Sequence, residues 1–286
     1  MRTAQLPWYD QGMATYLGVD LAWADGAGRV NETGVAALDA AGTVLAAGWT
    51  RGVAETVDWI ERHARDEDTV LFVDAPLLVD NPRGQRLCER QVGQRYGRWY
   101  VSANSTNQAT PRLAGVRLLG ALATTGWVYD DGRVDVDGAA RRVSECYPYT
   151  TLVGAAELGY EQRRPAYKRR PRRAAPGWRV TRAEVCDDLI VRLGGLRDAD
   201  PPLVLDSHPT TADLARAPSP TATVAYKHRE DLIDAVLCAW TAALWHRHGP
   251  DRCQVLGPTL AESAGAAATI IAPARAEQGR PVRGRG

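Results

Sequence analysis

The chain has 286 residues, of which 45% are hydrophobic, so it is long enough to bury the core of one large domain or two small ones. A formal net charge of +1 excludes a uniformly basic, histone-like protein, and lysine occurs only at Lys168 and Lys227. The five cysteines form no Cys-x-x-Cys pair and no apolar run is long enough to span a membrane, so we expect a reduced cytoplasmic protein without a zinc ribbon or membrane anchor.

The first third of the chain predicts a meander of three strands, then a helix and a fourth strand. Residues 1–13 show no periodicity and are expected to form an extension. Three short β-rich runs follow with tight connections, which is typical of an antiparallel meander. These runs are TYLGVD, which ends at Asp20, GVAALDA (34–40) and TVLAAGWT (43–50). Residues 52–66 have apolar side chains at helical spacing, and residues 69–77 are apolar throughout, like a strand in the middle of a sheet.

The rest of the chain alternates helices with short strands. Helices are expected at 83–96, 111–125 and 178–196, a strand ends at Glu145 before a short helix, and CQVLG and TIIAP are candidate closing strands. The tail 274–286 is basic and glycine-rich, and we expect it to be disordered. Because no linker or repeat divides the chain, we expect one α/β domain over residues 14–273, with a mixed sheet flanked by helices.

One helix near the C-terminus is apolar nearly all round and still contains a carboxylate. From Leu232 to Trp245 every residue is apolar or small except Asp234 and Thr241. Such a helix is buried, and an unpaired charge inside it is costly, so Asp234 needs a positive partner. Asp231 lies three residues earlier and therefore on the same helix face.

Other acids stand at strand positions where they could meet this helix face. Asp20 lies in the first strand, Asp74 terminates the buried strand, and Glu145 terminates the strand VSE. Like charges about 4 Å apart repel by roughly 4 kcal/mol at an effective dielectric of 20, and hard divalent cations with oxygen ligands relieve that repulsion. If the strands bring these acids to one edge of the sheet, we expect one or two Mg²⁺ or Mn²⁺ ions there, which can activate water to hydrolyse a phosphodiester.

Six short motifs are spread over most of the chain, from near residue 15 to near residue 245. They are GVDLAW (18–23), NETG (31–34), VDAPLLVDN with GQRLCER (73–90), ECYP (145–148), AYK (166–168) and KHREDLIDAVLCAWTA (227–242). In this order they resemble the family known as domain of unknown function 429, a predicted-nuclease branch of the ribonuclease H-like superfamily. The family closes with a glycine-aromatic strand where this chain has AATIIAP, so the resemblance does not place the last strand.

The resemblance implies a ribonuclease H-like fold with a central mixed sheet of five strands, and a last helix similar to that of Holliday-junction resolvases. It maps Asp20, Asp74, Glu145 and Asp234 onto the acidic positions of the family, with Asp231 alongside. In this interpretation Asp20 bridges two ions, Asp74 and Asp234 hold one each, and Glu145 or Asp231 completes the shell or positions the water. Each acid also has an ordinary alternative: Asp74 could cap a helix, Asp231 could interact with a helix dipole, and Glu145 could be a simple strand-end acid.

Candidate substrate-binding residues are cationic. Lys168 and Lys227 could reach the scissile phosphate, although Lys227 is also a simple neighbour of the acids that follow it. Arg86 could line a phosphate channel or a solvated face. The basic run 161–182 is either a solvated loop or a phosphate-binding segment with salt-dependent affinity.

These observations predict a metal-dependent nuclease that acts on DNA or RNA and has no membrane partner. Two alternatives remain open. Actin-like ATPases and sugar kinases also begin with a strand bearing Gly-x-Asp, but they need a duplicated domain, and the chain has no second such strand. A catalytically silent nucleic-acid-binding module of the same fold would bind in a salt-sensitive way even without its aspartates.

Overall fold

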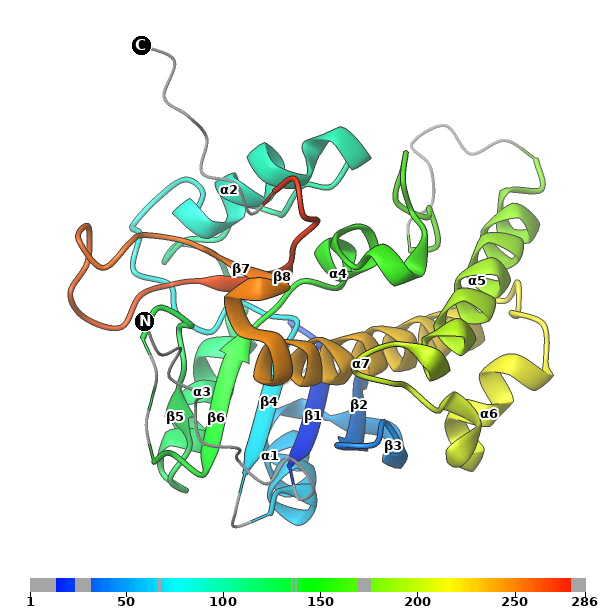
Figure 1. Ribbon diagram of the computed structural model, residues 1–286, viewed down its shortest axis with the longest axis horizontal. Coiled ribbons are helices and arrows are strands. Elements are labelled where there is room, and N and C mark those ends of the chain that lie inside the picture. Colours follow the sequence, from blue (N-terminus) through cyan, green and yellow to red (C-terminus); the bar gives the residue numbers. More distant parts are fainter. Residues whose placement is uncertain are drawn as a thin grey trace, which may run out of the picture.

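A six-stranded mixed sheet forms the centre of the computed structural model, which describes residues 14–23, 32–65, 68–134, 136, 138–168 and 176–278 (Figure 1). The strand order is β3-β2-β1-β4-β6-β5. The strands are β1 (Thr15–Asp20), β2 (Glu32–Asp39), β3 (Val44–Arg51), β4 (Thr69–Val73), β5 (Val128–Tyr129) and β6 (Arg141–Glu145). Strands β1 to β3 form the predicted antiparallel meander, and β4, β6 and β5 run parallel to β1. The predicted α/β class and mixed sheet are confirmed, whereas the expected extension 1–13 lies outside the described residues.

The edges of the sheet differ from the five strands that the resemblance implied. The short strand β5 adds a sixth, because Val128 and Tyr129 pair with Arg142 and Val143 of β6. The two closing segments are strands, β7 (Cys253–Leu256) and β8 (Ile270–Pro273), but they pair with each other in a separate antiparallel sheet. Residues 257–269 connect these two strands, and the hairpin adds no strand to the central sheet.

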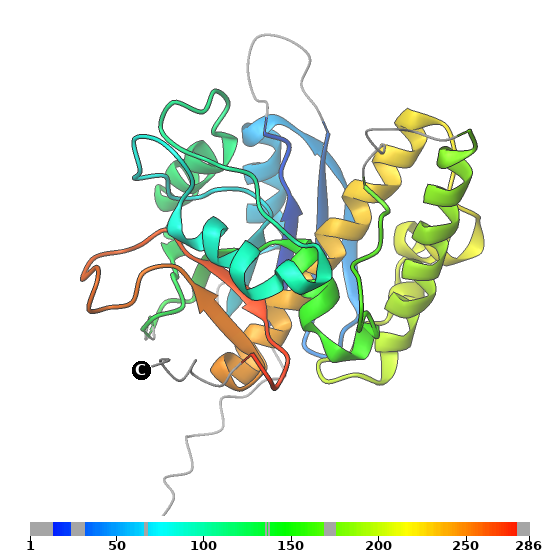
Figure 2. The same cartoon turned by 90° about the horizontal axis from the view of Figure 1, so that it is seen from above.

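Helices cover both faces of the sheet (Figure 2). On one face α7 (Thr223–His248) lies across β1, β2 and β4, with α2 (Leu87–Tyr96), α4 (Pro148–Gly154) and α5 (Trp178–Gly194) completing that layer. On the other face lie α1 (Gly52–His63) and α3 (Ala114–Ala123). The helix α6 (Pro209–Arg216) was not predicted in its proline-rich surroundings; Pro209 occupies its first turn, where proline is tolerated.

The alternation of side chains along the strands decides which face each strand end presents. Tyr16 and Phe72 belong to the core under α7, whereas Leu17, Leu71 and Val143 belong to the core under α1 and α3. Because successive strand residues point to opposite faces, the acids that continue β1 and β4 fall on the α7 face. The acid that ends β6, two residues after Val143, falls on the opposite face.

Two glycines let α7 approach the sheet closely. A Cβ atom at Gly18 of β1 would lie 2.1 Å from the carbonyl oxygen of Ala235, and one at Gly34 of β2 would lie 2.0 Å from the carbonyl oxygen of Asp231. Both contacts are with the helix backbone, so any larger residue would push the helix away. These glycines therefore fix the distance between the acidic stretch of α7 and the strand ends.

The described chain continues past the predicted start of a disordered tail at residue 274. Ala274 donates a backbone hydrogen bond to Arg252, and Arg275 is buried, with its Nε donating to the carbonyl oxygen of Val153. The prediction is thus wrong for residues 274–278, because Arg275 anchors them, and residues 279–286 lie outside the described part. Among the described helices, α7 included, none has the combined length and apolar character that crossing a membrane requires.

Candidate metal centre

Three aspartates converge at the carboxyl ends of β1 and β4. Asp20 ends β1, Asp74 directly follows β4, and Asp234 projects from the middle of α7; each offers a carboxylate oxygen, and these oxygens all lie within 4.8 Å of one another. The backbone N–H of Asp74 donates to the carbonyl oxygen of Val19 at 2.8 Å, so the two parallel strands end side by side. Asp234 is fully buried, whereas Asp20 and Asp74 are partly accessible. The three aspartates therefore lie close together, as the sequence predicted.

Lys168 is the positive partner that a buried Asp234 requires. Its Nζ lies 2.5 Å from Oδ2 of Asp234 and 3.7 Å from Oδ2 of Asp74. Burial alone would lower the pKa of Lys168, but the surrounding carboxylates, Asp234 foremost, raise it well above its ordinary value. The ammonium group is therefore charged at any physiological pH, and it faces the carboxylates.

Asp234 is incompletely neutralised by these contacts. Its Oδ1 accepts a hydrogen bond of 2.5 Å from the hydroxyl of Tyr167, while Oδ2 receives no hydrogen bond of ordinary geometry from the described residues besides its ion pair with Lys168. Burial, followed by the charge of Asp20, raises the pKa of Asp234 to about 7 against the opposing effect of Lys168. Near neutral pH this carboxyl group therefore accepts a proton more readily than an exposed aspartate does.

A second acidic group lies one helical turn away on α7. Asp231 is buried and pairs with the ammonium of Lys227, which also lies 3.1 Å from Oε1 of Glu230. Burial and the neighbouring charge of Asp20 raise the pKa of Asp231 to about 9. Asp20 thus interacts with both acids of α7. Around it, the carboxylates outnumber the two ammonium groups.

The donor set fits a hard divalent cation. The three converging aspartates offer oxygen ligands only, which Mg²⁺ and Mn²⁺ prefer. The excess of acids over lysines favours added positive charge at this place. Asp20, Asp74 and Asp234 are the residues that would hold such an ion, and Asp231 lies beside Asp20 rather than within the group of three.

Glu145, predicted to be a catalytic metal ligand, is directed elsewhere. Its carboxylate accepts hydrogen bonds of 2.8 and 2.6 Å from the guanidinium of Arg86 and one of 3.0 Å from the backbone N–H of Leu77. The strand end was predicted correctly, but the alternation along β6 turns Glu145 to the face opposite α7. The prediction that it joins the aspartates is wrong.

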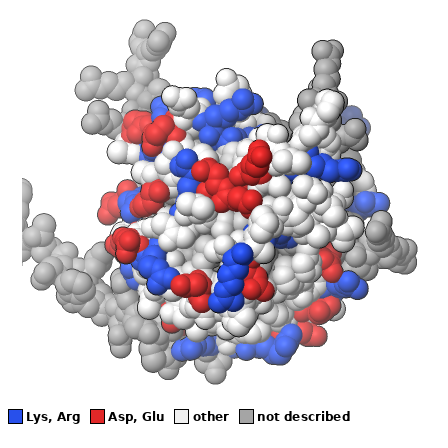
Figure 3. Space-filling model, turned by 90° about the vertical axis from the view of Figure 1, so that its right-hand side faces the viewer, with Lys and Arg blue, Asp and Glu red and all other residues white. Residues whose placement is uncertain are grey.

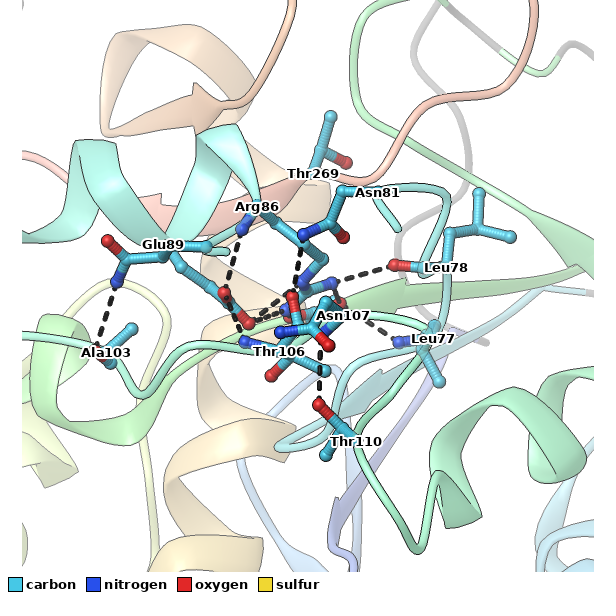
Figure 4. Close-up of polar contacts among 12 residues, drawn as sticks. Leu77, Leu78, Asn81, Arg86, Glu89, Ala103, Thr106, Asn107, Thr110 and Thr269 are labelled. Atoms are coloured by element: carbon cyan, nitrogen blue, oxygen red, sulfur yellow. Dashed lines mark hydrogen bonds and ion pairs between the residues drawn. The ribbon is translucent and has the colours of Figure 1, made fainter. Parts of the chain in front are cut away.

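Arg86, predicted to bind substrate, is also occupied. Its side chain is buried, and its Nε donates to Glu89 at 2.9 Å while its other nitrogens bind Glu145 and the carbonyl oxygen of Leu78. A guanidinium with these partners cannot reach out to a phosphate. It instead fixes the loop that follows Asp74, in the network drawn in Figure 4.

Sequence reasoning missed two residues, one that contacts Asp234 and one that contacts Arg86. Tyr167 lies within the AYK motif next to Lys168, and its hydroxyl contact with Asp234 could not be inferred because tyrosine is not a usual ligand of these ions. Glu89 stands three residues after Arg86, the spacing of a capping box, and its carboxylate also accepts from the backbone N–H of Thr106. That spacing is the one signal that could have found it.

A recess gives access to one side of the centre. Asp74 contributes to its wall, together with the side chains of Trp23, Tyr147 and Asn104, and the Arg86–Glu145 pair also lines it. Trp23 is 37% exposed, so the recess has an aromatic rim beside an accessible carboxylate. A polar group from solvent can therefore approach Asp74 here.

Comparison with known proteins gives one match. The model of a family described as protein of unknown function (DUF429) matches residues 18–259, which include the three converging aspartates and both lysines. No curated protein matches the chain, and no solved structure does.

Proposed function

The chain belongs to the DUF429 family, and from its site we propose that it is a metal-dependent nuclease of ribonuclease H-like fold that hydrolyses phosphodiester bonds of nucleic acid. The order of a three-strand meander, parallel strands and a helix laid across them is compatible with that fold. The observation that carries the proposal is the convergence of Asp20, Asp74 and Asp234 within 4.8 Å at the carboxyl edge of parallel strands, where ligands of α/β sheets commonly bind.

The roles of the chain's own groups follow from their positions. Asp20, Asp74 and Asp234 would hold one or two Mg²⁺ or Mn²⁺ ions, which would supply activation of a water molecule and stabilisation of the leaving oxygen. Tyr167 fixes the orientation of Asp234 through its hydroxyl. Lys168, held between Asp74 and Asp234, places a positive charge where a phosphate approaches the partly accessible Asp74.

One observation favours a second candidate function. The ammonium of Lys168 already neutralises part of the aspartate group, as it would in a catalytically silent nucleic-acid-binding module. That candidate needs no metal. The excess of carboxylates over ammonium groups and the raised pKa of Asp234 favour the metal-dependent enzyme over it. An ATP-handling protein of the actin type is less well supported, since the described residues contain one such six-stranded sheet rather than two.

The test is cleavage of labelled DNA and RNA, single-stranded, duplex and branched, with Mg²⁺ or Mn²⁺. The wild type is compared with Asp20→Asn and Asp234→Asn, and with Asp213→Asn as a matched control, since Asp213 is an exposed acid on α6. We expect metal-dependent cleavage by the wild type and the control, and a loss of about 10²-fold or more in both site variants. Equal activity in all four proteins would show that the activity does not come from this centre.

The rival functions give different results in two simpler measurements. A rise in melting temperature with Mn²⁺ alone, abolished by Asp234→Asn, supports the metal centre. A rise with Mg²⁺-ATP but none with Mg²⁺ alone would support the ATP-handling alternative. Salt-sensitive nucleic-acid binding without any cleavage, unchanged in both aspartate variants, would support the silent module.

A further inference from the structure

A row of alternating aromatic and cationic side chains leads away from the metal centre to the surface. The Nζ of Lys168 lies 5.1 Å from the ring centre of Tyr149, and the guanidinium of Arg164 lies 4.1 Å from the same ring. Arg164 also donates from Nε to the carbonyl oxygen of Tyr100 at 2.8 Å, and the guanidinium of Arg163 lies 4.8 Å from the Tyr100 ring. We call these five residues, from Lys168 to Tyr100, the aromatic-cationic row.

The outer end of the row is exposed and yet held in place. Tyr100 is 65% exposed, whereas Tyr149 at the inner end is 7% exposed. The backbone N–H of Arg164 donates to the carbonyl oxygen of Trp99, and the indole N–H of Trp99 donates to the carbonyl oxygen of Glu161. These bonds tie the segment with Arg163 and Arg164 to the segment with Tyr100.

The backbone at Tyr100 adopts a conformation that a tyrosine rarely takes. Its φ angle is 62°, in the left-handed region that favours glycine or asparagine. A bulky residue there carries strain on the order of 1 kcal/mol, and an exposed ring gains little from packing in return. A ring in this position, displayed to solvent, is a candidate for contact with a ligand.

The charges of the row are available to an anion. Glu161, the nearest acid in the same segment, is paired with Arg275 at 2.6 Å. Within the part of the chain that the structure describes, Arg163 and Arg164 form contacts with tyrosine rings and a carbonyl oxygen but no ion pair. On the face shown in Figure 3, acidic and basic side chains are interspersed, so charged groups there have neighbours of opposite sign.

We propose that the aromatic-cationic row binds a single-stranded segment of nucleic acid and leads it to the metal centre. A base stacks on Tyr100, Arg163 and Arg164 contact the phosphates beside it, and Lys168 receives the strand at the aspartates. Alternating π faces and cations are the arrangement by which proteins hold single strands without reading sequence. A duplex does not offer its bases to Tyr100 in this way. The inference rests on the proposed nuclease function for the position of the cleaved bond, but the binding itself requires no cleavage.

The experiment measures the fluorescence anisotropy of labelled single-stranded DNA and RNA of about 15 nucleotides, and of the matching duplexes, in EDTA so that nothing is cleaved. The variants are Tyr100→Asn, which suits the left-handed backbone but removes the ring, Tyr100→Phe, which keeps the ring, and Arg163→Ala. Arg216→Ala is the control, because Arg216 is an exposed arginine whose ion pair is with Asp213 on α6. Melting temperatures of all variants are measured in parallel.

We expect Tyr100→Asn to weaken single-strand binding by between about five-fold and about a hundred-fold, without lowering the melting temperature. Tyr100→Phe and the control should bind as the wild type does. Arg163→Ala should reduce the slope of log affinity against log salt by about 0.7. Wild-type affinity in Tyr100→Asn, or tighter binding of the duplex than of the single strand, would overturn the proposal.

A cleavage assay with the same proteins separates the two proposals. If the wild type binds through Tyr100 but cleaves nothing with Mg²⁺ or Mn²⁺, the nuclease function fails and the row remains a binding site. If the wild type and Tyr100→Asn cleave and bind equally well, the row fails and the nuclease function stands.

Discussion

Two groups of acids lie at the carboxyl edge of the sheet, and they are completed in different ways. At the end of β6, the guanidinium of Arg86 donates to both oxygens of Glu145 and to Glu89 of α2, and backbone N–H groups donate to the same two carboxylates. Beneath α7, the aspartates meet the ammonium groups of two lysines and the hydroxyl of Tyr167.

The two kinds of cation leave the carboxylates in different states. A guanidinium presents a rigid fork of donors that closes a carboxylate completely, whereas an ammonium is a compact point charge that leaves oxygen capacity unused. The Arg86 network is therefore structural: it holds the loop at Leu77 and Leu78 in place. The group of Asp20, Asp74 and Asp234 retains capacity for a further cation.

Removing the guanidinium should cause the greatest loss of stability. Arg86→Met leaves Glu145 and Glu89 buried without their cation, so we expect the free energy of unfolding to fall by about 3–5 kcal/mol. Urea denaturation followed by circular dichroism measures it. Arg98→Met is the matched control, because Arg98 forms an exposed ion pair with Glu277 and should change stability by less than about 1 kcal/mol. Equal losses of unfolding free energy in the two variants would mean that the buried network contributes no more to stability than an exposed ion pair.

Moving α7 away from the sheet should disrupt the aspartates without touching the Arg86 network. Gly18→Ala places a Cβ atom 2.1 Å and 2.3 Å from backbone atoms of Ala235 and Ala239, so we expect a loss of about 3 kcal/mol and weaker Mn²⁺ binding. In Gly48→Ala the new Cβ atom meets nothing within 4 Å, and stability should change by less than about 1 kcal/mol. Thermal unfolding with and without Mn²⁺ compares the two. Unchanged Mn²⁺ binding in Gly18→Ala would show that the helix position does not set the centre.

The same contrast shows what the sequence could predict. Asp234 was identifiable because an acid in an otherwise apolar helix is costly, and Asp20 and Asp74 because they stand at strand ends. Glu145 also stands at a strand end, but the prediction that it lies among the aspartates was wrong. Strand β6 has the sequence RRVSE with Val143 as its one apolar residue, so it shows no alternation from which the face of its terminal acid could be read.

Other features were hidden for different physical reasons. Lys168 lies in a loop, and no periodicity places a loop residue against a helix that follows much later in the chain. Strand β5 has two residues, too few to show alternation, and α6 begins at a proline within a segment whose composition suggested a loop. The sequence thus predicted the architecture and the converging aspartates, while the counter-charges depended on tertiary packing.

Replacing Lys168 should make the stability of the protein depend on a metal ion bound at the aspartates. The stability lost on replacing Arg86 should not depend on metal in this way. In Lys168→Met, Asp74 and Asp234 lose their nearest cation, but both can bind a proton because burial raises their pKa values. We therefore expect a loss of only about 2 kcal/mol in EDTA, and recovery of most of it in Mn²⁺. Urea denaturation in both conditions measures the change. Arg86→Met serves as the control, since Mn²⁺ should restore nothing there; absence of recovery in Lys168→Met would argue against an ion at the aspartates.

The smallest expected effect is a dependence of stability on pH that comes from the titration of Asp234. The pKa of Asp234 is about 7 in the folded protein and about 3.9 in an unfolded chain, so between these values the folded state binds more protons. Its contribution to stability is therefore full below about pH 3.9 and is lost as the pH rises through 7, by about 1 kcal/mol between pH 6 and pH 7. Asp234→Asn should reduce the slope by about this amount in metal-free buffer, as should saturating Mn²⁺ in the wild type, because the ion holds the carboxylate deprotonated. Urea denaturation at pH 6 and pH 7 measures it, with the exposed Asp213→Asn as control. Asp231, with its pKa of about 9, adds a slope of the same sign that remains in Asp234→Asn, so a slope identical to that of the wild type would show that Asp234 does not titrate in this range.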